Sequence, residues 1–246
     1  MYNILVKKII LFTLISLSSF ALPKKVVLGT FLIPGYVQSS TKGEFVEIVK
    51  KIEKELGIEI EIRVLPAKRA VLSFNNGEID GYFPSLDYYN EDLEINKTSA
   101  FYYKKDFLFH RIGDSPDIDN KKICLTSGYA YSKKILENKT LKFIYAKEQS
   151  KCLMMLSRKR VDGFISEGPS GLTALKRLSL RNIKMSSKLI SSMDVYFAIK
   201  NGNEGQAIAK EFSKAINKLK EARELERIFS NANKDLKRKL SKTTMN

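Results

Sequence analysis

Histidine is nearly absent from this 246-residue sequence, in which His110 is the single example. A metal site built from several histidines and catalysis by a histidine pair are therefore excluded. The sequence also lacks the Gly-x-Ser-x-Gly motif of hydrolases and the phosphate-binding loop of nucleotide-hydrolysing enzymes. His110 falls in a predicted connecting strand, where a structural role fits it best. We expect no catalytic residue, no metal, no cofactor and no enzymatic activity.

Long apolar runs are missing after residue 21. The chain begins with the basic segment MYNILVKK and continues into IILFTLISL, a run too short to span a bilayer stably. Ser19 and Ala21 supply small residues before a cleavage point, which predicts a secretory signal peptide removed after Ala21. An uncleaved N-terminal anchor is the alternative. We expect the mature chain to be soluble and, with no cysteine beside the cleavage point, to carry no lipid anchor.

Cysteine is scarce, with only Cys124 and Cys152. An exported chain meets an oxidising compartment, where two cysteines can form one disulfide. Both residues flank elements of one predicted βαβα unit, which favours a Cys124–Cys152 bridge. Two buried thiols are the alternative.

Acidic residues are outnumbered by basic ones, and the formal net charge is +16. This balance is compatible with an acidic partner, but also with a lysine-rich solvated surface. The lysines are interleaved with Glu and Asp and form no arginine-aromatic patch, so we expect no nucleic-acid partner. The polar, basic segment 233–246 is the exception and is expected to fray.

Alternating strand and helix patterns occur twice along the chain. The first set predicts strands at 25–31, 58–65 and 79–83 and helices at 43–57 and from Pro66 onward; the second predicts strands at 122–125, 141–146 and 161–166 and helices at 131–136, 150–158 and 171–178. Extended segments at 100–111 and 193–200 join the two sets, and a long helix at 204–219 follows. The pattern predicts an α/β fold of two lobes, each a mostly parallel sheet flanked by helices, with two hinge crossovers.

One helix–turn–strand junction is repeated in the two sets. Its kernels are Ile79-Asp80-Gly81-Tyr82 and Val161-Asp162-Gly163-Phe164. Asp can bond the turn backbone, Gly removes side-chain bulk, and the flanking residues suit a strand. We therefore interpret Asp80 and Asp162 as structural rather than catalytic.

The crossovers divide the chain into segments. We expect a signal peptide at 1–21, lobe 1 at 22–106 and 198–232, lobe 2 at 107–197, and a basic C-terminal tail at 233–246. Open α/β sheets bind ligands beyond the carboxyl ends of their strands, so the expected site lies between the lobes.

Five ordered segments resemble one family. They are GTFLIPGY, AKRAVLSFNNGEIDGYFP, SRKRVDGFISE, VYFAIKNG and EFSKAINKLKEA. The set resembles the bacterial extracellular solute-binding proteins of family three, the polar-amino-acid type. The resemblance implies a periplasmic "Venus flytrap" that captures a small solute and passes it to an ABC-type permease. Sensor modules and some enzymes share this architecture, so the fold does not fix the function.

The sequence departs from the family at one position. Amino-acid binders of the family carry an arginine after the third strand of lobe 1 that clamps the ligand carboxylate. The corresponding stretch, SLDYYNEDLEINKTSAFYY, has no arginine and is acidic. The chain is more similar to a subgroup whose second helix begins Pro-x-Lys-Arg, here Pro66 to Arg69, and which also has paired cysteines in lobe 2.

Strand ends nominate the binding residues of lobe 1. Phe31 and Tyr36 follow the first strand, and Tyr36 suits an aromatic wall with a polar tip, although a surface turn is the alternative. Arg69 suits capture of a carboxylate or phosphate, with a solvated helix position as the alternative. Phe83 and Ser85 follow the third strand.

In lobe 2 the candidates are Ser127, Gly128, Tyr129 and Glu167. The first three link a strand to a predicted helix start, where free backbone N–H groups attract anions, and the resemblance implies the same role. Glu167 follows a strand, at a position where the family often has an acid that meets a ligand's ammonium group.

The sequence predicts a monomeric periplasmic protein that binds a small anionic or zwitterionic, amino-acid-like solute. Its partners would be that solute and an ABC permease or a membrane sensor. A sensor or interaction module without a permease, or a periplasmic dehydratase or lyase with Glu167 and Arg69 as its acid–base pair, are the alternatives.

Overall fold

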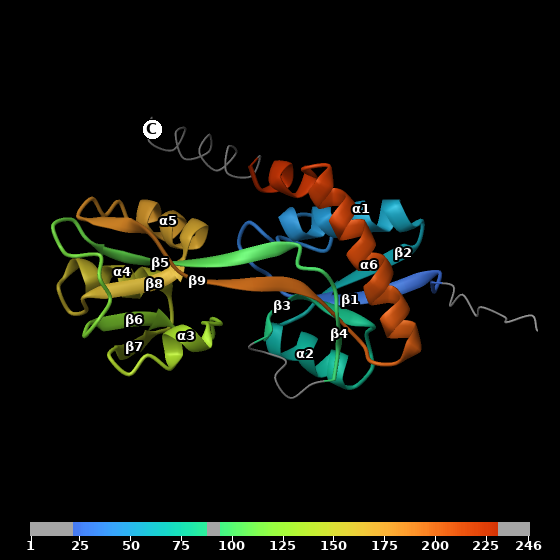
Figure 1. Ribbon diagram of the computed structural model, residues 1–246, viewed down its shortest axis with the longest axis horizontal. Helices are drawn as coiled ribbons and strands as arrows, with labels where there is room; N and C mark the ends of the chain where they lie inside the picture. Colours follow the sequence, from blue (N-terminus) through green and yellow to red (C-terminus); the bar gives the residue numbers. More distant parts are fainter. Residues whose placement is uncertain (1–21, 88–93, 231–246) are drawn as a thin grey trace, which may run out of the picture.

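The computed structural model describes residues 22–87 and 94–230. Figure 1 shows two α/β lobes side by side, joined by the long strands β5 and β9. This is the two-lobed α/β architecture that the sequence predicts. The elements are β1 (Lys25–Thr30), α1 (Glu44–Leu56), β2 (Glu59–Val64), α2 (Ala67–Asn75), β3 (Gly81–Ser85), β4 (Asn96–Lys97), β5 (Tyr102–Arg111), β6 (Lys122–Thr126), α3 (Lys133–Leu136), β7 (Lys142–Ala146), α4 (Gln149–Ser157), β8 (Gly163–Glu167), α5 (Gly168–Arg177), β9 (Ile183–Ile199) and α6 (Asn203–Glu221).

Lobe 1 is built around β1, in which Val26, Leu28 and Thr30 are buried. β1 pairs in parallel with β2 and β3, and the end of β9 runs antiparallel to β3 and β4. Helices α1 and α6 bury Ile48, Ile52 and Phe212 against one face of this sheet. Helix α2 buries Phe74 against the other face. Gly57 ends α1 in a left-handed conformation, which glycine adopts without a side-chain clash.

Lobe 2 repeats this plan. Strand β6 pairs in parallel with β7 and β8, and β8 runs antiparallel to β5. Helices α4 and α5 cover one face around Phe109 and Phe164, and α3 covers the other around Leu108 and Ile165. The carboxyl ends of the central strands in both lobes therefore point toward the junction between the lobes (Figure 1).

The crossovers β5 and β9 form one antiparallel ladder. Tyr102 lies opposite Val195 at one end and Arg111 lies opposite Ile183 at the other. The ladder joins the strands of the described residues in one continuous sheet, in the order β2-β1-β3-β9-β5-β8-β6-β7, with β4 paired to β9 beside this path. The sequence predicts the second crossover only at 193–200. Its first part contains exposed residues and four serines, at 186, 187, 191 and 192, and carries no continuous apolar signal, so pairing with β5 decides its conformation.

The repeated junction has the structural role that we expect. The N–H of Val27 donates to Oδ2 of Asp80 at 2.8 Å, and the N–H of Lys122 donates to Oδ2 of Asp162 at 2.9 Å. In each lobe the Asp N–H returns a bond to the carbonyl of the same residue, Val27 or Lys122. Each aspartate thus closes a two-way bond to the first strand of its lobe.

The glycine after each aspartate is closely packed, against backbone at Gly81 and against the ends of side chains at Gly163. A Cβ on Gly81 would lie 2.6 Å from the carbonyl oxygen of Ala198, and a Cβ on Gly163 would lie 2.6 Å from the side chain of Leu108. One chain builds the same joint twice because each lobe must end a helix and start a buried central strand within a few residues.

A disulfide between Cys124 and Cys152 confirms the predicted bridge. Both residues are fully buried, with their Cα atoms 5.5 Å apart, and the bond ties β6 to α4. Lobe 2 therefore has a covalent link between its sheet and one covering helix.

Some predictions fall outside the described residues or remain untested. The signal peptide at 1–21 and the basic tail at 233–246 lie outside the described residues, as does part of the acidic stretch that follows β3. The lobe boundaries at 106/107 and 197/198 stay a prediction. Within 22–87 and 94–230, no helix is long and apolar enough to cross a membrane.

Candidate functional site

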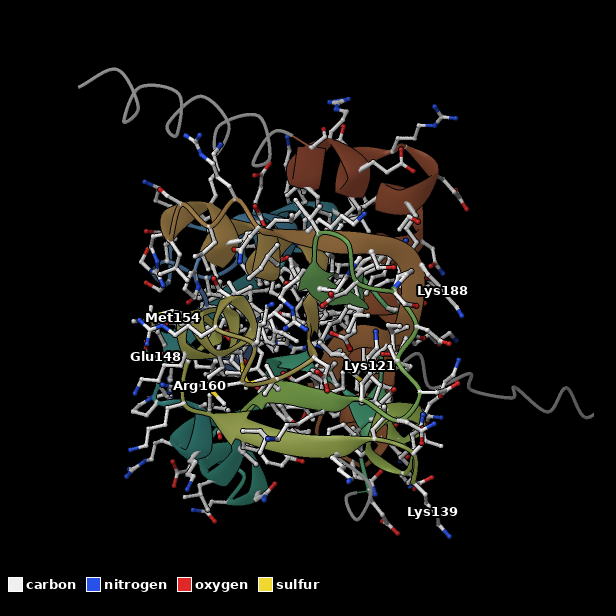
Figure 2. The ribbon with its side chains drawn as sticks, turned by 90° about the vertical axis from the view of Figure 1, so that its left-hand side faces the viewer. Lys121, Lys139, Glu148, Met154, Arg160 and Lys188 are labelled. Carbon is white, nitrogen blue, oxygen red and sulfur yellow. A yellow bond between two sulfur atoms is a disulfide. The ribbon has the colours of Figure 1, made fainter. Side chains whose placement is uncertain are left out.

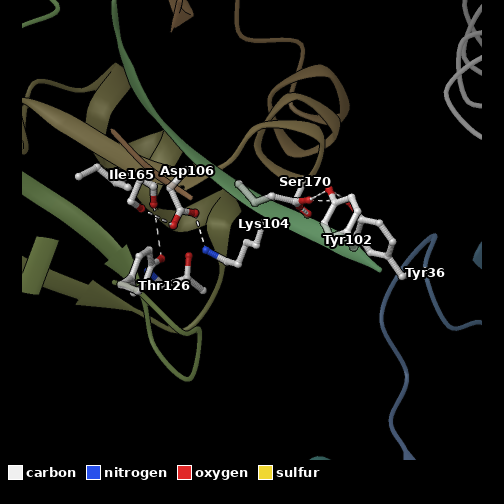
Figure 3. A network of polar contacts seen from close by, with 10 residues as sticks. Tyr36, Tyr102, Lys104, Asp106, Thr126, Ile165 and Ser170 are labelled. Atoms are coloured by element: carbon white, nitrogen blue, oxygen red, sulfur yellow. Dashed lines mark hydrogen bonds and ion pairs between the residues drawn. The ribbon is translucent and has the colours of Figure 1, made fainter. Parts of the chain in front are cut away.

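A hydrogen-bonded cluster joins the two lobes directly. The hydroxyl of Tyr36, from the loop after β1, donates to Oε1 of Glu167 at 2.5 Å. The hydroxyl of Tyr102, at the start of β5, donates to the same oxygen and lies 2.8 Å from the Tyr36 hydroxyl. Ser170 of α5 donates to Oε2 of Glu167. Figure 3 shows Tyr36, Tyr102 and Ser170 converging from lobe 1, the crossover and lobe 2.

Local structure fixes each member of this junction cluster. Ile33 and Val37 bond each other in both directions across a tight loop, which holds Tyr36 between them. The Tyr36 ring stacks on Phe45 of α1, with the ring centroids 4.6 Å apart. Glu167 ends β8 and immediately precedes α5, so it points out of the strand toward lobe 1.

The electrostatics of the cluster keep its phenols protonated. Burial, followed by the charge of Glu167, raises the pKa of both Tyr36 and Tyr102 well above the ordinary tyrosine value. Both hydroxyls are thus donors at neutral pH. Glu167 is almost fully buried and all its described partners are hydroxyl groups, so no cation among the described residues neutralises it.

Glu44, at the start of α1, is repelled by the same carboxylate. Its pKa rises to about 7, first because of burial and then because of repulsion from Glu167 and Glu47. Within the described residues none of these three acids forms an ion pair, so the junction holds an excess of negative charge.

A second polar group lies farther along β5 (Figure 3). The Lys104 ammonium pairs with Asp106, which is fully buried and also accepts a hydrogen bond of 3.1 Å from Ser191. Burial raises the pKa of Asp106, although Lys104 opposes the shift. The ammonium lies 5.2 Å from the centre of the Tyr131 ring, as in a cation–π contact.

In each lobe, one parallel strand ends at a threonine whose hydroxyl is buried. Thr30 ends β1 and Thr126 ends β6, and neither Oγ1 has a hydrogen-bond partner among the described residues. The N–H of Thr126 donates to the Tyr131 hydroxyl at 2.8 Å. Buried hydroxyls usually find partners, so these positions at the strand ends are uncommon.

The structure brings only some predicted residues together. Tyr36 and Glu167 meet, whereas Phe83 is fully buried in the core, 5.2 Å from the Phe197 ring, and Ser85 is fully buried and donates to the Tyr82 hydroxyl. The expectation that Phe83 lies at the edge of the site is wrong, because β3 is a central strand covered on both faces. Phe31 is half-buried beside Thr30.

The turn after β6 also differs from the expectation. The N–H of Ser127 already donates to the carbonyl of Ala146, and that of Tyr129 donates to Thr126. Helix α3 begins only at Lys133, so Gly128 and its neighbours do not open a helix. The predicted set of free N–H groups at a helix start is therefore wrong for Ser127 and Tyr129.

Arg69 lies on the exposed surface of α2 and forms no ion pair within the described residues. The pKa of Glu78 is lowered first by the hydrogen bond from Ser73, and the charge of Arg69 adds to this effect. The side chain is available to an anion, but the structure does not bring it to Glu167.

Sequence reasoning missed Tyr102, Lys104, Asp106 and Ser170. The first three lie in the aromatic stretch AFYYKKDFLFHR, which indicates only an extended connection. The signal that could have found them is an acid and two lysines within an otherwise apolar strand. No group of three metal-ligating side chains occurs in the part of the chain that the structure describes.

Comparisons with known proteins agree with the fold. The GluR0 ligand-binding core from Nostoc punctiforme, in complex with L-glutamate, has a TM-score of 0.64 and 15% identity, covering 84% of this chain and 98% of its own. An ancestral arginine-binding protein bound to arginine has a TM-score of 0.62 and 16% identity, covering 86% and 99%. A histidine kinase sensor domain with similarity to periplasmic binding proteins has a TM-score of 0.63 and 17% identity, covering 84% and 95%.

At these identities the three structures show a common fold alone. No curated protein sequence matches the chain. The model of one family does match, over residues 33–233, which includes every element from the Tyr36 loop to the end of α6. The chain belongs to the bacterial extracellular solute-binding proteins, family 3.

Proposed function

We propose that this protein captures a small polar, amino-acid-like solute between its two lobes in the periplasm. The observation that carries the proposal is the meeting of Tyr36 and Glu167 across the junction. An uncompensated buried carboxylate costs free energy, and a ligand ammonium group would neutralise it. Family membership supports the site class, and related folds have been seen with L-glutamate and with arginine.

The residues divide the recognition between them. Glu167 would receive the ammonium group, and the rings of Tyr36 and Tyr102 would flank it. Arg69, exposed and without an ion pair in the described residues, would supply the positive charge for a ligand carboxylate. Phe31 and the turn of Ser127, Gly128 and Tyr129 would line the site from the strand ends.

Binding would act through the crossovers. Tyr36 and Glu167 sit on different lobes, so a hinge motion in the β5–β9 ladder changes their separation without unfolding either lobe. A solute whose ammonium group replaces the two phenols at Glu167 would favour one arrangement of the lobes. A partner protein would then bind that arrangement.

The partner would be an ABC-type permease, which suits a monomeric, exported binding protein without catalytic activity. A membrane sensor is the second candidate, and it is favoured by the similarity to a histidine kinase sensor domain. The two alternatives use the same solute site and differ only in the protein that reads it.

A thermal-shift screen of residues 22–246 tests the proposal. Amino acids, polyamines, carboxylates, sugars and phosphorylated metabolites would be added singly, since a ligand at a hundredfold excess over its Kd stabilises the native state by about 2.7 kcal/mol. We expect an amine-bearing solute to raise Tm in the wild type and not in Glu167→Gln. A folded protein that responds to none of these classes would count against solute capture.

A further inference from the structure

Lobe 2 has a basic surface pocket that lies outside the junction. Lys151, Met154, Met155, Arg158 and Arg160 line a pocket of about 250 Å³ on the outer face of α4. Figure 2 shows Met154 and Arg160 on the end of lobe 2 that faces away from lobe 1. The disulfide at Cys152 lies on the opposite, buried face of the same helix.

The lining residues follow helical spacing. Lys151, Met154, Met155 and Arg158 occur at i, i+3, i+4 and i+7, which puts them in one row along α4. The two cations are then about 10 Å apart along the axis, with the methionines between them. The row offers two positive ends and an apolar centre of two half-buried methionines, of which Met155 also packs against the core of lobe 2.

Lys151, Arg158 and Arg160 have no acidic partner among residues 22–87 and 94–230. All three are exposed. The acid next to them, Glu148, accepts a hydrogen bond from Ser150 at the start of α4. In lobe 1, by contrast, Lys25 pairs with two glutamates and Lys200 pairs with Asp80 and Glu204.

The charge of the chain is concentrated in the same lobe. Residues 107–197 hold roughly twice as many Lys and Arg as Asp and Glu, whereas residues 22–106 hold nearly equal numbers. A lobe with this excess attracts an acidic surface over a distance of about 10 Å at moderate salt. Long-range attraction does not select a binding position. The pocket can select one, because it has a defined shape.

We propose that the outer face of α4 is a docking site for an acidic segment of a partner protein. The segment would present two carboxylates about 10 Å apart with an apolar side chain between them, as acids seven positions apart on a helix do. Arg158 and Arg160 suit carboxylates because the guanidinium can bond both oxygens. Met154 and Met155 would accept the apolar side chain, since methionine adapts to varied partners.

A flat anionic bilayer fits these observations less well. A bilayer would meet the lysines and arginines of lobe 2 broadly, including Lys176 and Arg177 of α5, and would not need a pocket with an apolar floor. The proposal does not depend on which solute the protein captures.

The probe is a fluorescein-labelled helical peptide with two Glu seven positions apart and Leu at the third and fourth positions after the first Glu. Its affinity for the full chain is measured by fluorescence anisotropy at about 150 mM salt. The methyl signals of Met154 and Met155 are followed by NMR, with Met185 and Met193 as internal references. We expect the first pair to shift and the second pair to stay in place.

The double variant Lys151→Glu/Arg158→Glu is expected to weaken peptide binding at least about tenfold. The matched double variant Lys176→Glu/Arg177→Glu makes the same change of charge on α5 and is expected to stay within about twofold. Lys151→Gln/Arg158→Gln, which is milder for folding, is expected to weaken binding as well, and circular dichroism checks that each variant is folded.

Equal weakening by both charge-reversed pairs would overturn the proposal, since it would indicate unspecific attraction to lobe 2. Absence of peptide binding, or binding without shifts at Met154 and Met155, would also overturn it. Binding to phosphatidylglycerol vesicles that Lys151→Glu/Arg158→Glu abolishes, without peptide binding, would replace the protein partner by a lipid surface.

Discussion

The Tyr36 hydroxyl of lobe 1 and the Glu167 carboxylate of lobe 2 form a direct hydrogen bond of 2.5 Å across the junction. The same carboxylate oxygen accepts the hydroxyl of Tyr102 from the crossover strand β5. Both lobes and the hinge thus meet at one negatively charged atom. We therefore expect a change of charge or of hydrogen bonding at this atom to alter the contact between the lobes.

Glu167→Gln should abolish binding of an amine-bearing solute. The amide keeps the size, and its oxygen can still accept the two tyrosine hydroxyls, but its NH2 group cannot accept the Ser170 hydroxyl. The substitution also removes the negative charge that attracts an ammonium group. We expect Kd to rise at least about tenfold, which corresponds to about 1.4 kcal/mol, in isothermal titration with the solute found by the screen.

Tyr102→Phe is the control for this change, because it removes one phenol from the same oxygen and leaves the charge. A much smaller loss of affinity is expected for Tyr102→Phe than for Glu167→Gln. Equal affinity of Glu167→Gln and the wild type would show that the carboxylate does not contact the solute.

Arg69→Ala should selectively weaken the binding of solutes that carry a carboxylate. Arg69 is exposed on α2 and is not engaged in an ion pair among the described residues, so its removal leaves the fold intact. We expect Kd to rise about tenfold for an amino acid and to stay unchanged for the corresponding amine without a carboxylate. Lys68→Ala, at the neighbouring exposed position, is the matched control. If both alanine variants behave alike, Arg69 has no special role.

Asp80 and Asp162 should contribute similar amounts to the free energy of unfolding. Each accepts a backbone N–H of the first strand in its lobe, and alanine would leave that donor without its bond. We expect Asp80→Ala and Asp162→Ala each to lower the free energy of unfolding by about 1–3 kcal/mol in urea titrations.

Asp80→Asn should cost less than Asp80→Ala, because the amide oxygen can still accept from Val27 while the ion pair with Lys200 is lost. Glu226→Ala, an exposed acid outside the junctions, is the charge control and should stay within about 0.5 kcal/mol of the wild type. A large effect of Glu226→Ala would show that the loss of stability in the aspartate variants comes from the change in net charge.

Glu44 should make stability depend on pH. Its pKa is raised to about 7 in the folded state, above the ordinary value of 4.5, so the folded state binds the proton more tightly than the unfolded chain. Folding therefore becomes less favourable as pH rises through the window between these values, and the loss is complete above the higher one. Glu44→Gln should flatten this slope and raise stability by about 1–2 kcal/mol at pH 8 after allowance for solvent screening.

The measurement is urea unfolding at several pH values for the wild type and Glu44→Gln. Glu47→Gln, on the exposed side of α1, is the comparison and should leave most of the slope in place. Identical slopes in wild type and Glu44→Gln would rule out the raised pKa of Glu44 as their cause.

Reduction of Cys124–Cys152 should destabilise the protein. The bridge closes a segment with a sequence separation of 28, and opening it restores conformational entropy to the unfolded chain. A loss of about 2–4 kcal/mol is expected in urea titrations with and without a reductant, or in the Cys124→Ala/Cys152→Ala variant. Unchanged stability on reduction would mean that the packing of α4 on β6 holds the two elements together without the disulfide.

The sequence by itself determined the elements and their order. Periodicity placed most helices and strands to within a few residues, since amphipathic patterns reflect which face is buried. The repeated Asp-Gly kernels and the paired cysteines predicted local roles that the structure bears out, because these roles depend on a few neighbouring residues. Tyr36 and Glu167 were also nominated from sequence, because strand ends collect ligand-facing side chains in α/β sheets.

Tertiary structure alone decided which of these residues meet. Phe83 and Ser85 follow the same rule of strand ends as Glu167, and all three side chains are buried. Phe83 packs in the core of lobe 1 and Ser85 bonds Tyr82 of its own strand, whereas Glu167 bonds Tyr36 of the other lobe. Tyr102 enters the junction only because β5 pairs with β9 and carries its side chain past the ends of other strands. Lys104 and Asp106 meet for a local reason, since residues two positions apart on a strand share a face. Contacts between residues more than sixty positions apart depend on the packing of whole elements, and no local pattern encodes them.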